Sequence, residues 1–153
     1  MQTVIKNSRD HYVIKIFNPT AGTITENVTL TSMVNNKLIL DGTDQRVNVK
    51  QFAWSGPLAS NLKIFRAAKT TPALPEVLLT EAAPENSINL DFSELGYVES
   101  TNNNQDFKFV LTSGVTCYMS VRRESGYKTT FEPEVYGIYD NPAIVDTPTN
   151  PNP

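Results

Sequence analysis

The stretch QRVNVKQFAWSGPLASNLKIFRA, residues 45–67, decides the fold class of this chain. Each half alternates apolar and polar residues, which is the period of a β-strand, and the first half ends on the only tryptophan, Trp54. The Ser-Gly-Pro run between them is typical of a turn, because Gly permits a positive φ and Pro cannot donate to a ladder. We therefore predict two strands joined by a tight loop. The alternation slips between Val49 and Phe52, which predicts a β-bulge near Lys50 or burial of both faces.

Strand-like alternation continues on both sides of this stretch. Further strands are expected over residues 11–17, 23–33, 37–40, 87–92, 107–111 and 115–121. Glu26 falls on the apolar face of its strand, which indicates a sheet edge or a bulge. Ser113 and Gly114 form a turn signal, so we expect the last two strands to pair as a second hairpin. Residues 76–83 also suit a helix of about two turns. Because Pro84 cuts the segment short and its neighbours are strands, we favour a strand there.

The pattern predicts an all-β fold, an antiparallel β-sandwich of jelly-roll-like type with about eight or nine short strands. Residues 1–10 are expected to be an N-terminal arm that can form a short edge strand. Residues 11–139 are expected to form the sandwich domain. Residues 140–153 are rich in proline, which favours extended geometry over a helix or a ladder, so we expect an extended C-terminal tail.

Composition excludes several classes of function. The chain has 153 residues and a net charge of -3, with no block of basic residues, so a nucleic-acid partner is not expected. It contains no run of about 20 apolar residues, so a membrane span is not expected either. The N-terminal residues do not read as a secretory signal, and a single cysteine, Cys117, allows no intrachain disulfide. We therefore expect synthesis in a cytoplasm.

No catalytic, cofactor-binding or metal site is expected from the titratable residues, and so no enzyme. His11 is the only histidine and begins a strand. Cys117 lies within an apolar alternation, which places it in the core and far from an activating histidine. Asp41 and Asp44 offer two carboxylates to a calcium ion, but Asp and Gly at a turn explain the same residues, so an ion there stays an open question. Two acidic pairs, Glu132 with Glu134 and Asp91 with Glu94, are interpreted as solvated surface.

Two surface features remain. Arg122 and Arg123, with Arg66 and Lys63, are interpreted as strand-end charges that pair with acids on a neighbouring chain. The aromatic residues include Trp54 and Tyr118, which could line a sugar-binding face only if they were exposed and coplanar. The alternation places Trp54 inside.

Four segments carry a resemblance to a known group of proteins. They are VNVKQFAWSG with LKIFRA, then VLLTEA, then SINLDFSELG, then DFKFVLTSGVTCYMSVRRESGY. Together they resemble small β-sandwich virion proteins of tailed bacteriophages, especially of marine and cyanobacterial phages, over roughly residues 23–127. The resemblance implies a structural role in a phage particle and assigns no functional residue.

The hypothesis drawn from this resemblance is a non-enzymatic virion protein, a capsid decoration or cement protein that stabilises the head shell through surface and arm contacts. Its partners would be the major capsid protein or other virion proteins, and it would form a homo-oligomer or an array. The expected partner contacts lie in the C-terminal part, at Tyr136, Tyr139, Ile144 and Val145. The alternatives are a tail, neck or fibre-base protein, or a carbohydrate-binding β-sandwich used in host adsorption.

Overall fold

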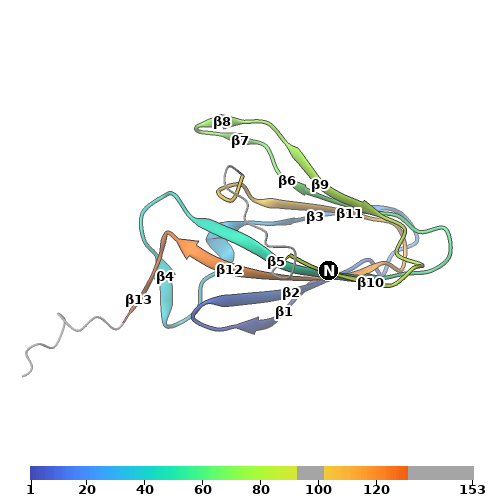
Figure 1. Ribbon diagram of the computed structural model, residues 1–153, viewed down its shortest axis with the longest axis horizontal. Helices are drawn as coiled ribbons and strands as arrows, with labels where there is room; N and C mark the ends of the chain where they lie inside the picture. The colour runs from blue at the N-terminus through green and yellow to red at the C-terminus, as the bar shows by residue number, and fades with distance from the viewer. Residues whose placement is uncertain (93–101, 131–153) are drawn as a thin grey trace, which may run out of the picture. The chain divides into compact units, whose positions relative to one another are not determined.

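The computed structural model describes residues 1–92 and 102–130, and these form antiparallel β-sheets (Figure 1). The larger sheet has the order β1 (Gln2–Asn7), β2 (His11–Phe17), β12 (Thr116–Ser125), β5 (Arg46–Ser55), β10 (Ile88–Asp91). The second has the order β3 (Ile24–Val28), β11 (Phe107–Leu111), β6 (Leu62–Arg66), β9 (Val77–Ala82). Two small sheets pair β13 (Tyr127–Thr129) with β4 (Leu38–Leu40), and β7 (Lys69–Thr70) with β8 (Ala73–Leu74). Within the described residues the one helical element is the short 3-10 turn η1 (Leu30–Ser32), so the prediction of an all-β, antiparallel chain is confirmed.

The chain divides into two compact units. The first comprises residues 1–34 and 40–127 and holds both larger sheets. The second comprises residues 35–39 and the chain from residue 128 onward. In its described part, Asn35 and Leu38 form an antiparallel bridge, and the Thr130 N–H donates to the Lys37 carbonyl at 3.0 Å.

The two larger sheets lie as two layers and share one cluster of buried apolar side chains (Figure 1). Period-two alternation places every second residue of each inner strand in this cluster, as Ile14 and Ile16 of β2 and Phe107 and Phe109 of β11 illustrate. Burying a large apolar side chain fully is worth about 1.5–3 kcal/mol, so this cluster is the main source of stability. Trp54 is 8% exposed and belongs to the cluster, as its place in the alternation predicted.

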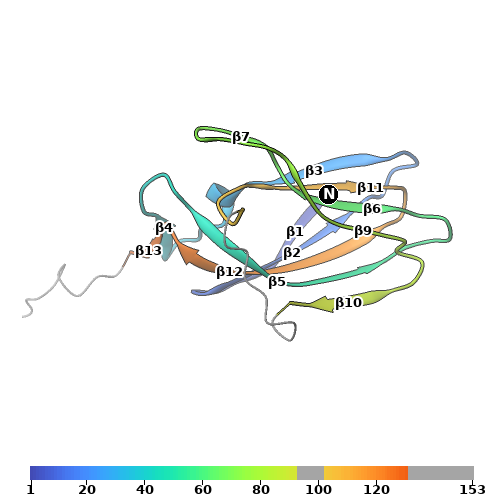
Figure 2. The same cartoon turned by 45° about the horizontal axis from the view of Figure 1, so that its top comes forward.

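Four short links carry the chain from one larger sheet to the other, and all four turn at the same end of the unit (Figures 1 and 2). They are residues 18–23, 56–61, 83–87 and 112–115. Neighbouring links are joined by backbone hydrogen bonds. The Asn18 N–H donates to the Val115 carbonyl at 3.0 Å, and the Thr112 N–H donates to the Asn61 carbonyl at 3.1 Å. Each of these four links therefore joins two strands that lie in different sheets.

The predicted hairpin of β11 with β12 is wrong for this reason. The turn at Ser113 and Gly114 exists, with Gly114 at a φ of +77°, but β11 pairs with β3 and β6 while β12 pairs with β2 and β5. The two strands joined through Gly56 and Pro57 behave in the same way, since β5 and β6 also belong to different sheets. A turn signal predicts that the chain reverses. It does not predict whether the returning strand pairs beside its predecessor or crosses the core.

The predictions for bulges, edges and the ambiguous stretch can be checked directly. In β5 the register against β12 shifts between Gln51 and Val49, so Lys50 is the extra residue of a bulge, as predicted. β3, which carries Glu26, is the edge of the four-stranded sheet, as that residue indicated. The first residues of the chain form β1, which pairs with β2 as an edge strand. Residues 77–82 form β9, so the preference for a strand over a helix is confirmed.

Candidate functional site

Four basic side chains from four strands gather on the outer face of the five-stranded sheet, the face away from the buried cluster. We call this group the basic cluster: Lys6 of β1, His11 of β2, Lys50 of β5 and Arg122 of β12. Lys6, Lys50 and Arg122 are exposed and His11 is half-buried. The four residues are far apart in sequence, and only the pairing of the strands brings them together.

Strand register explains how each side chain reaches this face. Arg122 lies opposite His11 in the β12–β2 ladder, and its neighbours Val121 and Arg123 are both buried, so Arg122 points outward. Lys6 lies opposite Val13, which shares the outer face of β2 with His11. Lys50 reaches the group because it is the bulged residue of β5, and a bulge re-aims its side chain.

The surroundings of His11 show that these charges lie close together. The Lys50 ammonium lies 3.3 Å from His11 Nε2, a geometry in which a neutral imidazole accepts the hydrogen bond. Partial burial, and then the positive charges of Lys50, Lys6 and Arg122, lower the pKa of His11, while Asp10 acts in the opposite direction. Burial and neighbours of like sign thus both favour the neutral form of His11.

The cluster presents positive charge that the described part of the chain does not neutralise. Within residues 1–92 and 102–130, Lys6, Lys50 and Arg122 form no ion pair with an acidic side chain. Other surface cations do form such pairs, as Arg46 does with Asp44 at 2.9 Å. Ammonium and guanidinium groups bind carboxylates and phosphates through charge-assisted hydrogen bonds, so the cluster is suited to an anionic partner.

The basic group that the sequence suggested is not assembled as expected. Arg66 is fully buried and donates from Nη1 to the Gln105 carbonyl and from Nη2 to the Val47 carbonyl, both at 2.7 Å. Arg123 is buried as well. Of the four residues proposed, Arg122 is the one that joins other exposed cations. The position of Arg122 among these cations follows from the strand register, which places Arg122 opposite His11. A sequence-based prediction would have needed that register.

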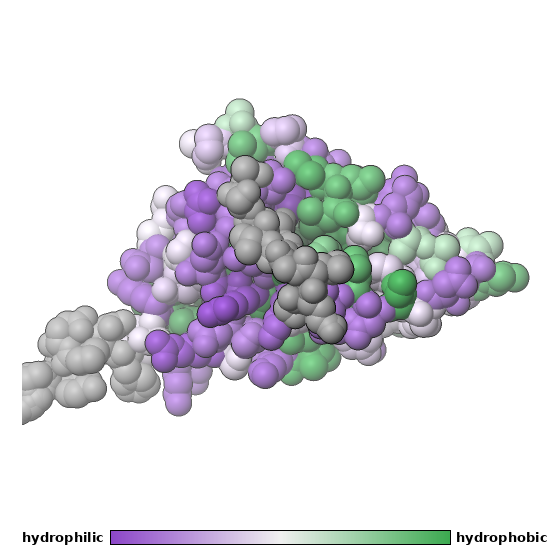
Figure 3. All heavy atoms as spheres, viewed as in Figure 1, coloured by the Kyte–Doolittle hydropathy of each residue, from purple (hydrophilic) through white to green (hydrophobic). Residues whose placement is uncertain are grey.

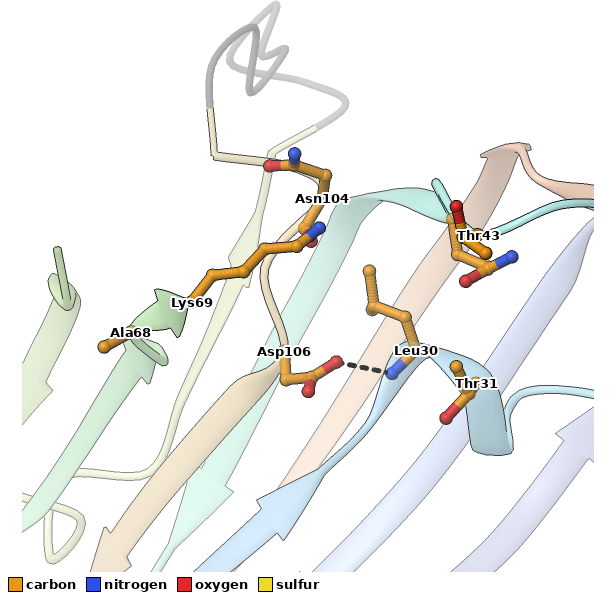
Figure 4. Close-up of a pocket in the computed structure, with 8 residues that line it drawn as sticks. Leu30, Thr31, Thr43, Ala68, Lys69, Asn104 and Asp106 are labelled. Carbon is orange, nitrogen blue, oxygen red and sulfur yellow. Dashed lines mark hydrogen bonds between the residues drawn. The ribbon is translucent and has the colours of Figure 1, made fainter. Parts of the chain in front are cut away.

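A second feature is a small hollow of about 160 Å³ in the same unit (Figure 4). Its wall includes Lys69, Asn104 and Asp106. The Asp106 carboxylate accepts the Leu30 N–H at 2.8 Å, and Lys69 Nζ donates to the Asn104 carbonyl at 3.2 Å, as Figure 4 places them. Asn104 Oδ1 is buried and has no hydrogen-bond partner among the described residues. Its lining residues place no nucleophile beside a base.

The other predicted positions have simpler roles. Cys117 is buried, and burial raises the pKa of its thiol, which agrees with the predicted core position. The Asp44 carboxylate is bound by Arg46, and the described residues contain no group of three potential metal-ligating side chains. Tyr118 is 41% exposed on the outer face of the five-stranded sheet.

Several predicted positions lie outside the described residues. They are Glu94, Glu132, Glu134 and the expected partner contacts Tyr136, Tyr139, Ile144 and Val145.

Comparisons with known proteins add no family. No family model matches the chain, and neither a curated protein nor a solved structure matches it. Among the described residues, no helix has the length and apolar character needed to cross a membrane.

Proposed function

We propose that this chain is a β-sandwich of jelly-roll topology and serves as a non-enzymatic structural protein of a bacteriophage virion. Within the particle, its proposed place is on the head, as a decoration or cement protein. It would bind the major capsid protein or its own copies through exposed faces and chain ends.

The single observation that carries the proposal is the strand order. Strands β2-β12-β5-β10 in one sheet face β3-β11-β6-β9 in the other, and each of the four links joins strands at matching positions in the two orders. That arrangement supports the proposed jelly roll, to which β1 would be an additional strand at one edge. Jelly rolls form the shells of many viruses and also occur in lectins. The sequence resemblance to phage virion proteins favours the first of these two uses.

The exposed surface agrees with a role in assembly. The basic cluster supplies an unneutralised charged face, and Leu78 on β9 supplies exposed apolar surface at 51% exposure. Figure 3 shows hydrophobic side chains over β6 and β9 in this view. Contacts of this kind stabilise a shell by burial and charge pairing and need no reaction.

The test is binding to phage heads. Purified chain is added to heads of the encoding phage from which this protein is missing, and the heads are sedimented and heated. We expect saturable binding and a rise of several degrees in the temperature at which the heads release DNA. Labelled antibody in electron micrographs then separates a head position from a tail, neck or fibre-base position. Absence of the chain from purified virions would contradict the proposal.

A carbohydrate-binding jelly roll is the second candidate. Two observations favour it: the exposed ring of Tyr118, and the hollow of Figure 4, whose wall includes the polar residues Lys69, Asn104 and Asp106. The aromatic platform first considered does not include Trp54, because that side chain lies in the core. A glycan array with wild-type protein and with Tyr118→Ala tests this candidate. Binding that survives Tyr118→Ala and is lost in Asn104→Ala would assign the hollow as the site.

A further inference from the structure

We propose that the basic cluster binds the acidic C-terminal segment, residues 131–153, of a second copy of this chain. The inference deepens the proposed structural role, since it names one contact by which copies would be joined. It does not require that the assembly be a phage head.

The first argument is charge complementarity. Residues 131–153 contain four acidic residues, Glu132, Glu134, Asp140 and Asp146, and no lysine or arginine. Their formal charge is therefore -4. Because the whole chain carries -3, residues 1–130 carry +1. The negative charge of the protein is concentrated in this segment, and a group of exposed cations without acidic partners lies on the sheet face.

The second argument is the chemistry of the two surfaces. Tyr136 and Tyr139 lie in sequence between Glu134 and Asp140, and Arg122 is an exposed guanidinium on the outer face of the sheet. Guanidinium groups bind carboxylates through paired hydrogen bonds and stack on aromatic rings, so Arg122 is suited to both kinds of side chain. Tyr118, which faces the same side of β12 four residues before Arg122, extends the surface with an exposed ring.

The third argument is reach. A fully extended chain spans about 3.3 Å per residue, so 23 residues cover up to about 75 Å. A segment of that length can bridge from one copy to the sheet face of the next. The contact joins different surfaces on the two copies, so it is heterologous, and its repetition gives a ring or an extended array.

Nucleic acid fits the cluster less well. Phosphate binding grows with the number of neutralised charges, and the cluster offers three permanent cations on a protein with a net charge of -3. A carboxylate-bearing segment makes the same number of contacts and carries no long polyanion that the rest of the surface would repel.

The test is self-association of the full chain, measured by sedimentation velocity. Variant one neutralises the cluster with Lys6→Gln, Lys50→Gln and Arg122→Gln. Variant two neutralises the segment with Glu132→Gln, Glu134→Gln, Asp140→Asn and Asp146→Asn. A control variant makes the same change of charge elsewhere, with Lys37→Gln, Lys63→Gln and Lys108→Gln. Circular dichroism checks that each variant keeps the wild-type spectrum.

We expect wild-type protein and the control to associate at about 50 mM salt and to dissociate at about 500 mM, because screening shortens the range of the charges. Each of the first two variants alone should associate at least tenfold more weakly. Mixed in equal amounts, they should form one-to-one dimers, because one supplies an intact segment and the other an intact cluster. Association is restored on mixing only when the contact joins two copies of the chain.

The dependence of association on pH gives an independent readout. His11 faces Lys50, Lys6, Arg122 and the acid Asp10. An acidic segment laid over this group favours the protonated imidazole, so association should strengthen as the pH falls from about 7 to about 5.5. It should then be lost below about pH 4, where the carboxylates of the segment gain protons.

Four results would overturn the inference. These are a wild-type chain that stays monomeric at low salt, association that survives both variants, mixing without recovery, and salt-sensitive binding of DNA that competes for the cluster. Binding to phage heads is measured separately. Heads that bind variant one as well as wild type would leave the virion role standing even if the association test rejects this contact.

Discussion

Arg122 and Arg123 are neighbours on β12 and have opposite environments. Arg123 is 8% exposed and points inward, where it donates from Nε to the Met33 carbonyl at 2.9 Å and from Nη1 to the Ser8 carbonyl at 2.6 Å. Its guanidinium also lies 5.7 Å from the ring centre of Tyr12. Arg122 points outward, is exposed, and forms no ion pair with an acid of the described residues.

The difference between the two arginines shows that the two faces of β12 have different roles. The inner face of β12 fixes the position of loops, because the buried guanidinium satisfies carbonyls that would otherwise lose their water without a replacement. The outer face contributes little to folding and leaves its charge available to a partner. Residue type alone does not distinguish the two arginines. Their parity in the strand does, because successive side chains of a strand point to opposite faces of the sheet.

The largest effect is expected from Arg123→Ala. The substitution leaves the Met33 and Ser8 carbonyls without their donor in a buried position, and each orphaned group costs about 1–3 kcal/mol. We expect the free energy of unfolding to fall by about 4 kcal/mol in urea titrations. Arg122→Ala should change it by less than about 0.5 kcal/mol. Equal losses in the two variants would show that both side chains are structural.

A somewhat smaller loss, about 3 kcal/mol, is expected from Met119→Ala. Met119 is fully buried between the sheets, and truncation of a buried methionine costs about 2–5 kcal/mol through lost burial and the cavity left behind. Tyr118→Ala, on the outer face one residue earlier, should cost less than about 1 kcal/mol. Thermal unfolding followed by circular dichroism measures both. A Tyr118 variant as unstable as the Met119 variant would mean that something covers the outer face in solution.

A loss of about 1–3 kcal/mol is expected from Gly56→Ala, in the link between β5 and β6. A Cβ there would lie 2.8 Å from Ser60 Oγ and 3.0 Å from Pro84 Cβ, so the links would have to shift. Gly22 lies in the link between β2 and β3, and a Cβ at that position meets no atom within 4 Å. Gly22→Ala should therefore leave the melting temperature within about two degrees of wild type. If Gly56→Ala were as stable as wild type, the links would not be tightly packed.

The sequence predicted the strands and their inner faces, because burial on one side imposes a period of two that any single strand displays. It even located the bulge at Lys50, since the alternation must slip where an extra residue enters. It did not predict which strands pair. The turn at Gly114 reads the same whether the chain forms a hairpin or crosses to the facing sheet, so β11 and β12 were wrongly paired.

The basic cluster escaped prediction for the same reason. Lys6, His11, Lys50 and Arg122 are separated by up to 116 residues, and they meet through long-range ladders. Sequence proximity instead suggested Arg122 with Arg123, which the strand period sends to opposite faces. Long-range register is set by the packing of the whole domain, so no local pattern contains it.

The smallest effect predicted is a change in the pKa of His11 on Lys50→Gln. As the only histidine, His11 gives a single imidazole signal that NMR can follow through a titration. Partial burial, then the nearby ammonium and the charges of Lys6 and Arg122, lower the pKa of the imidazole, so removal of the ammonium should raise that pKa toward the ordinary value of about 6.5. Salt should raise the wild-type pKa in the same direction, because it screens the cations.

Lys15→Gln is the control. It removes a charge from the same outer face but not from the surroundings of His11, and should leave the pKa of His11 unchanged. A pKa that responds equally to both substitutions would mean that the sheet face acts as a diffuse positive surface and that the four residues do not form a distinct site.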